Sequence, residues 1–217
     1  MAILFLFPLL LSCGANYETL YEITKGDVTY TLEGTGGIPK RISLIKDGYA
    51  IYRLDIHPDA SVGSDNGTYG FFVEDANFDG VNDLFIATKK EGELCTYDVY
   101  LATNGGSSFT KSKELSALTN VRVKKEYNAV FGFTQTKAPA GGDHYTLCDR
   151  STKYVWENGR LVPDLYVALT YYSEQNLYCY STAIYDENAK EFDPPRDKWL
   201  TPSEYEKTDF GFLYYYK

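Results

Sequence analysis

The acidic stretch at residues 74–84, Glu-Asp-Ala-Asn-Phe-Asp-Gly-Val-Asn-Asp-Leu, constrains this chain more than any other segment. Oxygen-bearing side chains occupy alternate positions, Gly80 follows them, and a further carboxylate comes three residues later. This is the ligand order of a calcium loop, in which the residue after the glycine offers only its backbone carbonyl. Glycine suits that position because the chain turns there with positive φ. We predict a structural Ca²⁺ site whose ligands are Asp75, Asn77, Asp79, Val81 and Asp83.

The flanks of this stretch indicate strands. Tyr69, Phe71 and Val73 alternate before it, and the apolar run at residues 84–87 follows it. A helix–loop–helix calcium site would also need a bidentate Glu at its twelfth position, where this chain has Ile86. The pattern therefore predicts a strand–loop–strand site. The alternative is an acidic β-turn on the surface.

The remaining sequence predicts an all-β domain. The chain has 217 residues, of which 21 are Tyr and 12 are Phe, and both residue types favour strands. Short strand-like segments recur between turns, and Asp47-Gly48 and Asn158-Gly159 are typical of tight hairpins. Residues 111–120 suggest a short helical turn or an irregular connection, and residues 211–216 a final strand. We expect one domain at residues 13–217, a small β-propeller of about four to five blades, or alternatively a β-sandwich.

The N-terminus is typical of an exported protein. Residues 1–12 are apolar and uncharged, too few to span a membrane, and fit a signal peptide. Leu10-Leu11-Ser12-Cys13 resembles the lipobox of bacterial lipoproteins, although no Lys or Arg follows Met1. That resemblance implies lipidation at Cys13 and a lipid anchor as the only membrane contact, at the periplasmic or outer-membrane side of the cell envelope. An ordinary cleaved signal or a buried strand is the alternative.

Charge and cysteine content narrow the possible partners. The net charge is −9, and no basic cluster interleaves with aromatic residues, so nucleic acid is not an expected partner. An acidic surface suits a basic protein partner. The spacing of the three later cysteines does not suggest zinc, and it leaves open one disulfide or buried free thiols. These cysteines are Cys95, Cys148 and Cys179.

No catalytic motif identifies an enzyme, and we expect a non-enzymatic protein. His57 and His144 stand beside no recognisable nucleophile, and the chain has neither Gly-x-Ser-x-Gly nor a phosphate-binding glycine loop. A pair of carboxylates that meet only in space stays open. Trp156 and the tyrosines suit either a core or a sugar-stacking surface.

Three segments within residues 69–162 resemble one protein family. They are the acidic stretch at residues 73–84, the hairpin around Tyr97, Phe109 and Leu115, and the later segment Tyr154-Val155-Trp156-Glu157-Asn158-Gly159-Arg160-Leu161-Val162. The family comprises calcium-binding, propeller-like bacterial lipoproteins that act as immunity proteins against lysozyme-like effectors of antibacterial type IV secretion.

The resemblance implies a small propeller, a bound calcium and export, and an inhibitor of a peptidoglycan hydrolase as the function. Surface adhesion or glycan binding is the alternative. Residues 104–108 and 139–143 are the candidate partner-binding loops because they are rich in glycine and expected to be exposed. The identity of the partner is not encoded in these motifs.

Overall fold

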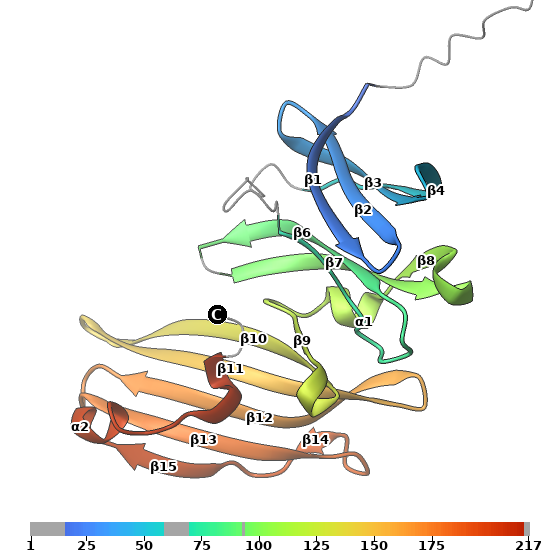
Figure 1. Cartoon of the computed structure of the whole chain (residues 1–217). Helices are drawn as coiled ribbons and strands as arrows, with labels where there is room; N and C mark the ends of the chain where they lie inside the picture. The colour runs from blue at the N-terminus through green and yellow to red at the C-terminus, as the bar shows by residue number, and fades with distance from the viewer. Residues whose placement is uncertain (1–15, 59–69, 93, 215–217) are drawn as a thin grey trace, which may run out of the picture.

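The computed structural model describes residues 16–58, 70–92 and 94–214, and in this part of the chain nearly all regular structure is β-strand. The strands form three antiparallel sheets that do not close into a barrel. Figure 1 shows the first sheet above the second, and the third, which is the largest, below both. The predicted all-β class is confirmed, whereas three sheets replace the four to five blades expected.

The first two sheets are four-stranded meanders, in which each strand pairs with the next one along the chain. The first contains β1 (Glu18–Lys25), β2 (Val28–Thr35), β3 (Ile38–Lys46) and β4 (Tyr49–Asp55). The second contains β5 (Phe71–Glu74), β6 (Asp83–Glu91), β7 (Leu94–Thr103) and β8 (Ser108–Lys111). The Asp47-Gly48 hairpin is confirmed, because both residues have the positive φ of a type I′ turn, 51° and 79°.

The third sheet has seven strands, with long central hairpins. In sheet order it runs β14 (Glu191–Phe192), β13 (Leu177–Asp186), β12 (Arg160–Tyr172), β11 (His144–Glu157), β10 (Ala129–Gly141) and β9 (Arg122–Lys124), and β15 (Arg196–Leu200) also pairs with β13. The Asn158-Gly159 turn between β11 and β12 is confirmed, with φ of 50° and 76°. The short helices are α1 (Lys113–Ser116), α2 (Pro202–Tyr205), η2 (Asn104–Gly106), η3 (Lys125–Tyr127) and η4 (Gly211–Tyr214).

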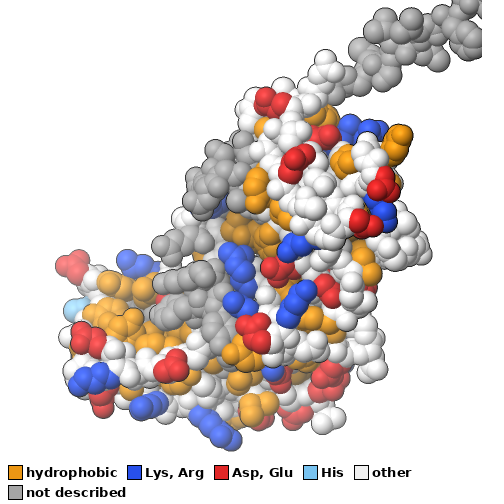
Figure 2. All heavy atoms as spheres, viewed as in Figure 1, with side chains coloured by type: hydrophobic (Ala, Val, Ile, Leu, Met, Phe, Trp, Pro, Cys, Tyr) orange, Lys and Arg blue, Asp and Glu red, His pale blue; other side chains and the backbone are white. Residues whose placement is uncertain are grey.

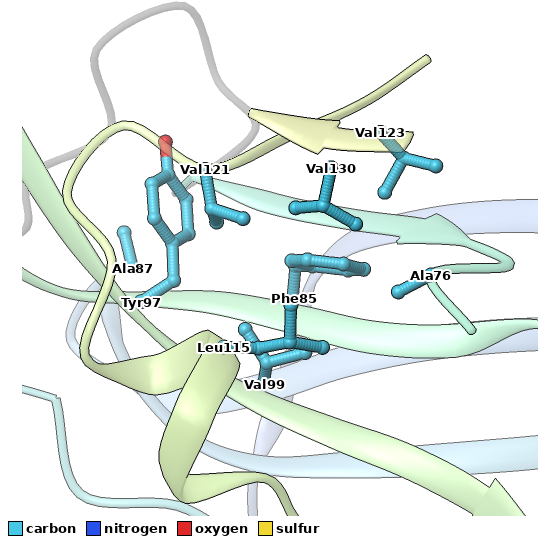
Figure 3. Packing of buried hydrophobic residues seen from close by; sticks show 9 residues of the cluster. All are labelled: Ala76, Phe85, Ala87, Tyr97, Val99, Leu115, Val121, Val123 and Val130. Atoms are coloured by element: carbon cyan, nitrogen blue, oxygen red, sulfur yellow. The ribbon is translucent and has the colours of Figure 1, made fainter. Parts of the chain in front are cut away.

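The second sheet packs against both of the others, because successive side chains of β6 point to opposite faces and both faces are apolar. Leu84 and Ile86 pack against Leu32 of the first sheet. Phe85 points the opposite way, into a cluster that includes Val130 of the third sheet. Figure 3 shows this cluster, with valines of β9 and β10 over the Phe85 ring and Leu115 of α1 at its other side. Burying a side chain of this size contributes about 2–3 kcal/mol.

Two predicted segments were wrong in type. The tail expected as a strand forms η4, and Leu213 in it is buried against Val167 and Leu169 of β12. The candidate loop at residues 139–143 is mostly strand, because β10 continues to Gly141 and only a two-residue turn separates it from β11. The helical turn expected within residues 111–120 is confirmed as α1, whose first turn is capped by the Ser112 side chain.

Candidate metal centre

The acidic loop closes a hairpin between β5 and β6, in which Glu74 pairs with Asp83. The predicted strand–loop–strand arrangement is therefore confirmed. Phe78 and Gly80 have φ of 60° and 86°. A bulky residue rarely adopts this left-handed conformation. The Phe78 ring packs against the cluster between the second and third sheets, and this packing offsets the backbone cost.

The first three predicted ligands gather around one turn of the loop. Asp75 Oδ1 and Asn77 Oδ1 both accept a hydrogen bond from the backbone N–H of Asp79, at 3.1 and 3.2 Å. Asp75 Oδ2 accepts from the N–H of Gly80 at 2.9 Å. Asp79 Oδ1 accepts from the N–H of Val81 at 2.8 Å, and its Oδ2 from the Asn77 amide at 2.9 Å. The local fold thus brings Asp75, Asn77 and Asp79 together without distant contacts.

Asp83 lies differently from the other three side chains. It is fully buried, and its Oδ2 and Oδ1 accept hydrogen bonds from the backbone N–H groups of Ala76 and Ala102, both at 2.7 Å. Burial raises the pKa of Asp83 to about 6, and the negative charges of Asp79 and Asp75 act in the same direction. Asp83 therefore ties the acidic loop to β7 and lies within the electrostatic field of the other carboxylates.

The donor set fits calcium in part. In residues 16–58, 70–92 and 94–214, no group of three or more His, Cys, Asp and Glu side chains forms a ready metal site. Calcium also accepts amide and carbonyl oxygens, and the turn offers Asp75, Asn77 and Asp79 on neighbouring positions. Each Asp83 oxygen accepts one backbone N–H group and keeps a second lone pair with which it can bind an ion. The calcium ligands thus stay a prediction.

The acidic loop also contacts the turn at residues 104–108. A Cβ built on Gly106 would lie 3.2 Å from Cγ1 of Val81, so this turn and the loop pack closely. The strand that leads into the turn is bonded to the loop through Ala102 and Asp83. In the turn itself Asn104, Gly105 and Ser107 are exposed. The loop therefore supports an exposed turn, and the sequence alone did not reveal this contact.

A contact from the third sheet reaches the same loop. The Trp156 indole Nε1 donates a hydrogen bond of 2.6 Å to the carbonyl of Ala76. The acidic loop is thus joined to β7 by Asp83 and to β11 by Trp156.

No helix in the described part of the chain has the length and apolar character needed to cross a membrane. Cys13 and the predicted signal peptide at residues 1–12 lie outside the described residues.

Comparison with known proteins adds little to this description. The chain is similar to a Xanthomonas type IV secretion system related protein. The TM-score is 0.48 at 15% identity, and the alignment covers 86% of this chain and 97% of that one. No protein-family model and no curated protein matches the chain. A likeness at this level assigns neither a family nor an activity.

The histidines and cysteines singled out in the sequence do not form a common site. His57 and His144 are both exposed; His57 follows the end of β4 in the first sheet, and His144 begins β11 in the third. The three described cysteines are free thiols. Cys148 and Cys179 pair with Thr170 from opposite sides, so about 10 Å of sheet separates them, too far for a disulfide.

A cleft at the junction of the three sheets was not anticipated. Its volume is about 310 Å³, and its lining comprises Lys25, Val73, Glu74, Asn82, Val123, Lys124, Lys125 and Glu126. These residues come from separated parts of the chain, so the only local signal was the adjacent pair Lys124-Lys125. Burial raises the pKa of the Glu74 carboxyl, although the nearby Lys25, Lys125 and Arg122 act to lower it.

Proposed function

We propose that this chain is a calcium-stabilised binding protein of the bacterial cell envelope, anchored through Cys13, that inhibits a lysozyme-like peptidoglycan hydrolase. The ion would be held by Asp75, Asn77, Asp79, the Val81 carbonyl and Asp83. It would supply positive charge to a loop in which three carboxylates lie within reach of one another. Its role is structural, and the proposal assigns no chemistry to it.

The observation that carries this proposal is the contact between the acidic loop and the exposed turn at residues 104–108. Val81 packs against Gly106, and Asp83 bonds the backbone of Ala102 just before the turn. Fixing the loop with an ion would therefore fix the turn. A preorganised turn binds a partner with a smaller entropy cost. We place the partner-binding surface here in preference to residues 139–143, which lie largely in β10.

The partner class rests on charge and on the family resemblance of the acidic loop and the Trp156 hairpin. A net charge of −9 favours association with a basic enzyme. On the face in Figure 2 acidic and basic side chains are interspersed, with a group of Lys and Arg side chains near the middle. Charge is therefore expected to accelerate encounter and to contribute to specificity, and the 104–108 turn supplies the shape that a partner must match.

The test measures hydrolysis of peptidoglycan by lysozyme-like hydrolases, with and without the purified protein. Inhibition is expected in calcium and should weaken in chelator. Ser107→Trp adds a bulky ring to the exposed turn and should abolish inhibition while the fold is kept. Asn188→Trp, in the exposed turn after β13, is the matched control. Hydrolysis that the unmodified protein leaves untouched would refute the proposal.

Calcium binding is tested separately, by thermal unfolding in calcium and in chelator. The unmodified protein should melt at a higher temperature in calcium, and Asp79→Ala should remove that difference. Asp186→Ala is the control, because it deletes a carboxylate that accepts backbone N–H groups in another surface turn. This variant should keep the difference in melting temperature between calcium and chelator. Identical melting curves of the unmodified protein in the two buffers would rule out the site.

Glycan binding is the second candidate, and one observation favours it. Trp199 is 54% exposed on β15, and its ring lies 5.2 Å from that of Tyr172. An exposed tryptophan ring offers an apolar face on which a sugar ring stacks. Binding in a glycan array that Trp199→Ala abolishes, together with no inhibition of hydrolysis, would favour this function over the first.

A further inference from the structure

The cleft at the junction of the three sheets differs in charge from the chain as a whole. Lys25 ends β1, Glu74 ends β5, and Lys124 ends β9, so each sheet contributes one wall. Lys125 and Glu126 of η3 complete the rim. A ligand in this cleft would touch all three sheets.

The cleft concentrates positive charge in an acidic protein. Lys25, Lys124, Lys125 and Arg122 all lie close enough to act on the charge of Glu74. Of these, the three lysines line the cleft together with two carboxylates, those of Glu74 and Glu126, in a chain whose net charge is −9. Like charges held this close repel one another unless a counter-charge lies between them. The surplus is positive, and the residues that provide it are about 100 positions apart in the sequence.

Size and neutral groups narrow the ligand class. A volume of about 310 Å³ lies at the small end of ligand sites and suits a small molecule. Val73 and Val123 supply an apolar part of the wall. Asn82 is held by a hydrogen bond to the Tyr30 phenol. Ammonium groups arriving from several directions match a ligand with more than one anionic group.

We propose that this cleft binds a small dianion of the dicarboxylate or phosphate class, held by Lys25 from the first sheet and by Lys124 and Lys125 from the third. The anion neutralises the surplus charge and joins the sheets at the side of the acidic loop. Neither the calcium site nor hydrolase inhibition requires it, so this assignment stands apart from the proposed function. A ligand that binds only the folded chain also stabilises it.

The test uses the full ¹⁵N-labelled chain and the probes succinate and sulfate, at constant ionic strength because charge contacts are screened by salt. Saturable shifts are expected for the backbone amides of Glu74, Asn82 and Lys125. Lys25→Ala combined with Lys125→Ala should weaken binding by about tenfold or more. The double Arg variant at these positions keeps both charges and should keep most of the affinity.

Lys207→Ala removes one charge from an exposed site outside the cleft and should leave binding unchanged. Shifts spread over many surface lysines, or a double Ala variant that binds as well as the unmodified chain, would overturn the assignment. If the double Ala variant does not fold, the single variants Lys25→Ala and Lys125→Ala decide. Each should then weaken binding, and unchanged affinity in both would overturn the assignment equally.

Discussion

The Trp156 indole donates a 2.6 Å hydrogen bond to the Ala76 carbonyl, across 80 residues of sequence. Ala76 is fully buried and belongs to the cluster between the second and third sheets, against which Trp156 also packs. The bond therefore fixes the acidic loop of the second sheet to a long hairpin of the third. Two segments that resemble one family in sequence are in direct contact here.

Trp156→Phe should lower the free energy of unfolding by about 1–2 kcal/mol, because it leaves the buried Ala76 carbonyl without this donor. Trp199→Phe changes an exposed tryptophan and should alter the free energy of unfolding by less than about 0.5 kcal/mol. Urea unfolding followed by circular dichroism measures both. Equal effects of the two substitutions would contradict the structural role of the Trp156 bond.

The acidic loop was predictable because its determinants are local. Alternating oxygens, Gly80 and strand-like flanks all lie within residues 69–87, and the structure keeps Asp75, Asn77 and Asp79 around one turn. Asp83 belongs to the same motif, yet its oxygens bond Ala76 and Ala102, and the second of these lies on another strand. Nothing in the local pattern encodes that partner.

The errors have physical causes of the same kind. The sequence predicts a loop at residues 139–143 because they are rich in glycine, yet β10 stays paired with β11 as far as Gly141 at an exposed edge, where proline is tolerated. The aromatic tail at residues 211–216 has strand composition, but Leu213 finds its burial against β12 from a helical turn. Pairing with β11 decided the first segment, and packing against β12 decided the second. The cleft lysines could not be predicted from sequence, because only the fold brings Lys25 close to Lys124 and Lys125.

The two tryptophans also allow calcium to be observed at the loop itself. Trp199→Phe leaves Trp156 as the only tryptophan, bonded beside the acidic loop, and calcium should then change its emission in a saturable way. Trp156→Phe leaves Trp199, whose emission should not respond. A fluorimetric titration of both variants measures this. A response from Trp199 alone would place calcium elsewhere.

Asp83 should make the calcium-free protein less stable as the pH rises. Its carboxyl has a pKa of about 6 in the fold against an ordinary value of 3.8, so the folded state binds the proton more tightly than the unfolded state. This contribution is complete below about pH 4 and is lost as the pH rises through 6. The difference corresponds to about 3 kcal/mol. Calcium, which favours the ionised carboxylate, should reduce the loss.

Urea unfolding at pH 4, 5.5 and 7, compared with Asp83→Asn, isolates this effect. The amide side chain of this variant does not titrate, so the variant should lack this pH dependence. It should also be less stable at every pH, because the NH₂ group of the new side chain is a donor and cannot accept the backbone N–H that one Asp83 oxygen accepts. If the variant does not fold, ¹³C NMR of the Asp83 carboxyl in the unmodified chain measures the pKa directly. A value near 4 would contradict the expected pH dependence.

Two strand glycines make a matched pair for packing, because neither has a positive φ. A Cβ on Gly34 would collide with the Ile38 carbonyl oxygen and lie 2.7 Å from Leu20 Cδ1, whereas a Cβ on Gly132 would lie 3.4 Å from its nearest neighbour, in Leu118. Gly34→Ala should therefore cost about 1–3 kcal/mol, since backbone must shift. Gly132→Ala should be neutral or stabilising by up to about 1 kcal/mol. Urea unfolding measures both, and a Gly34→Ala variant as stable as the parent would show that the β2–β3 end of the first sheet yields more easily than its close contacts imply.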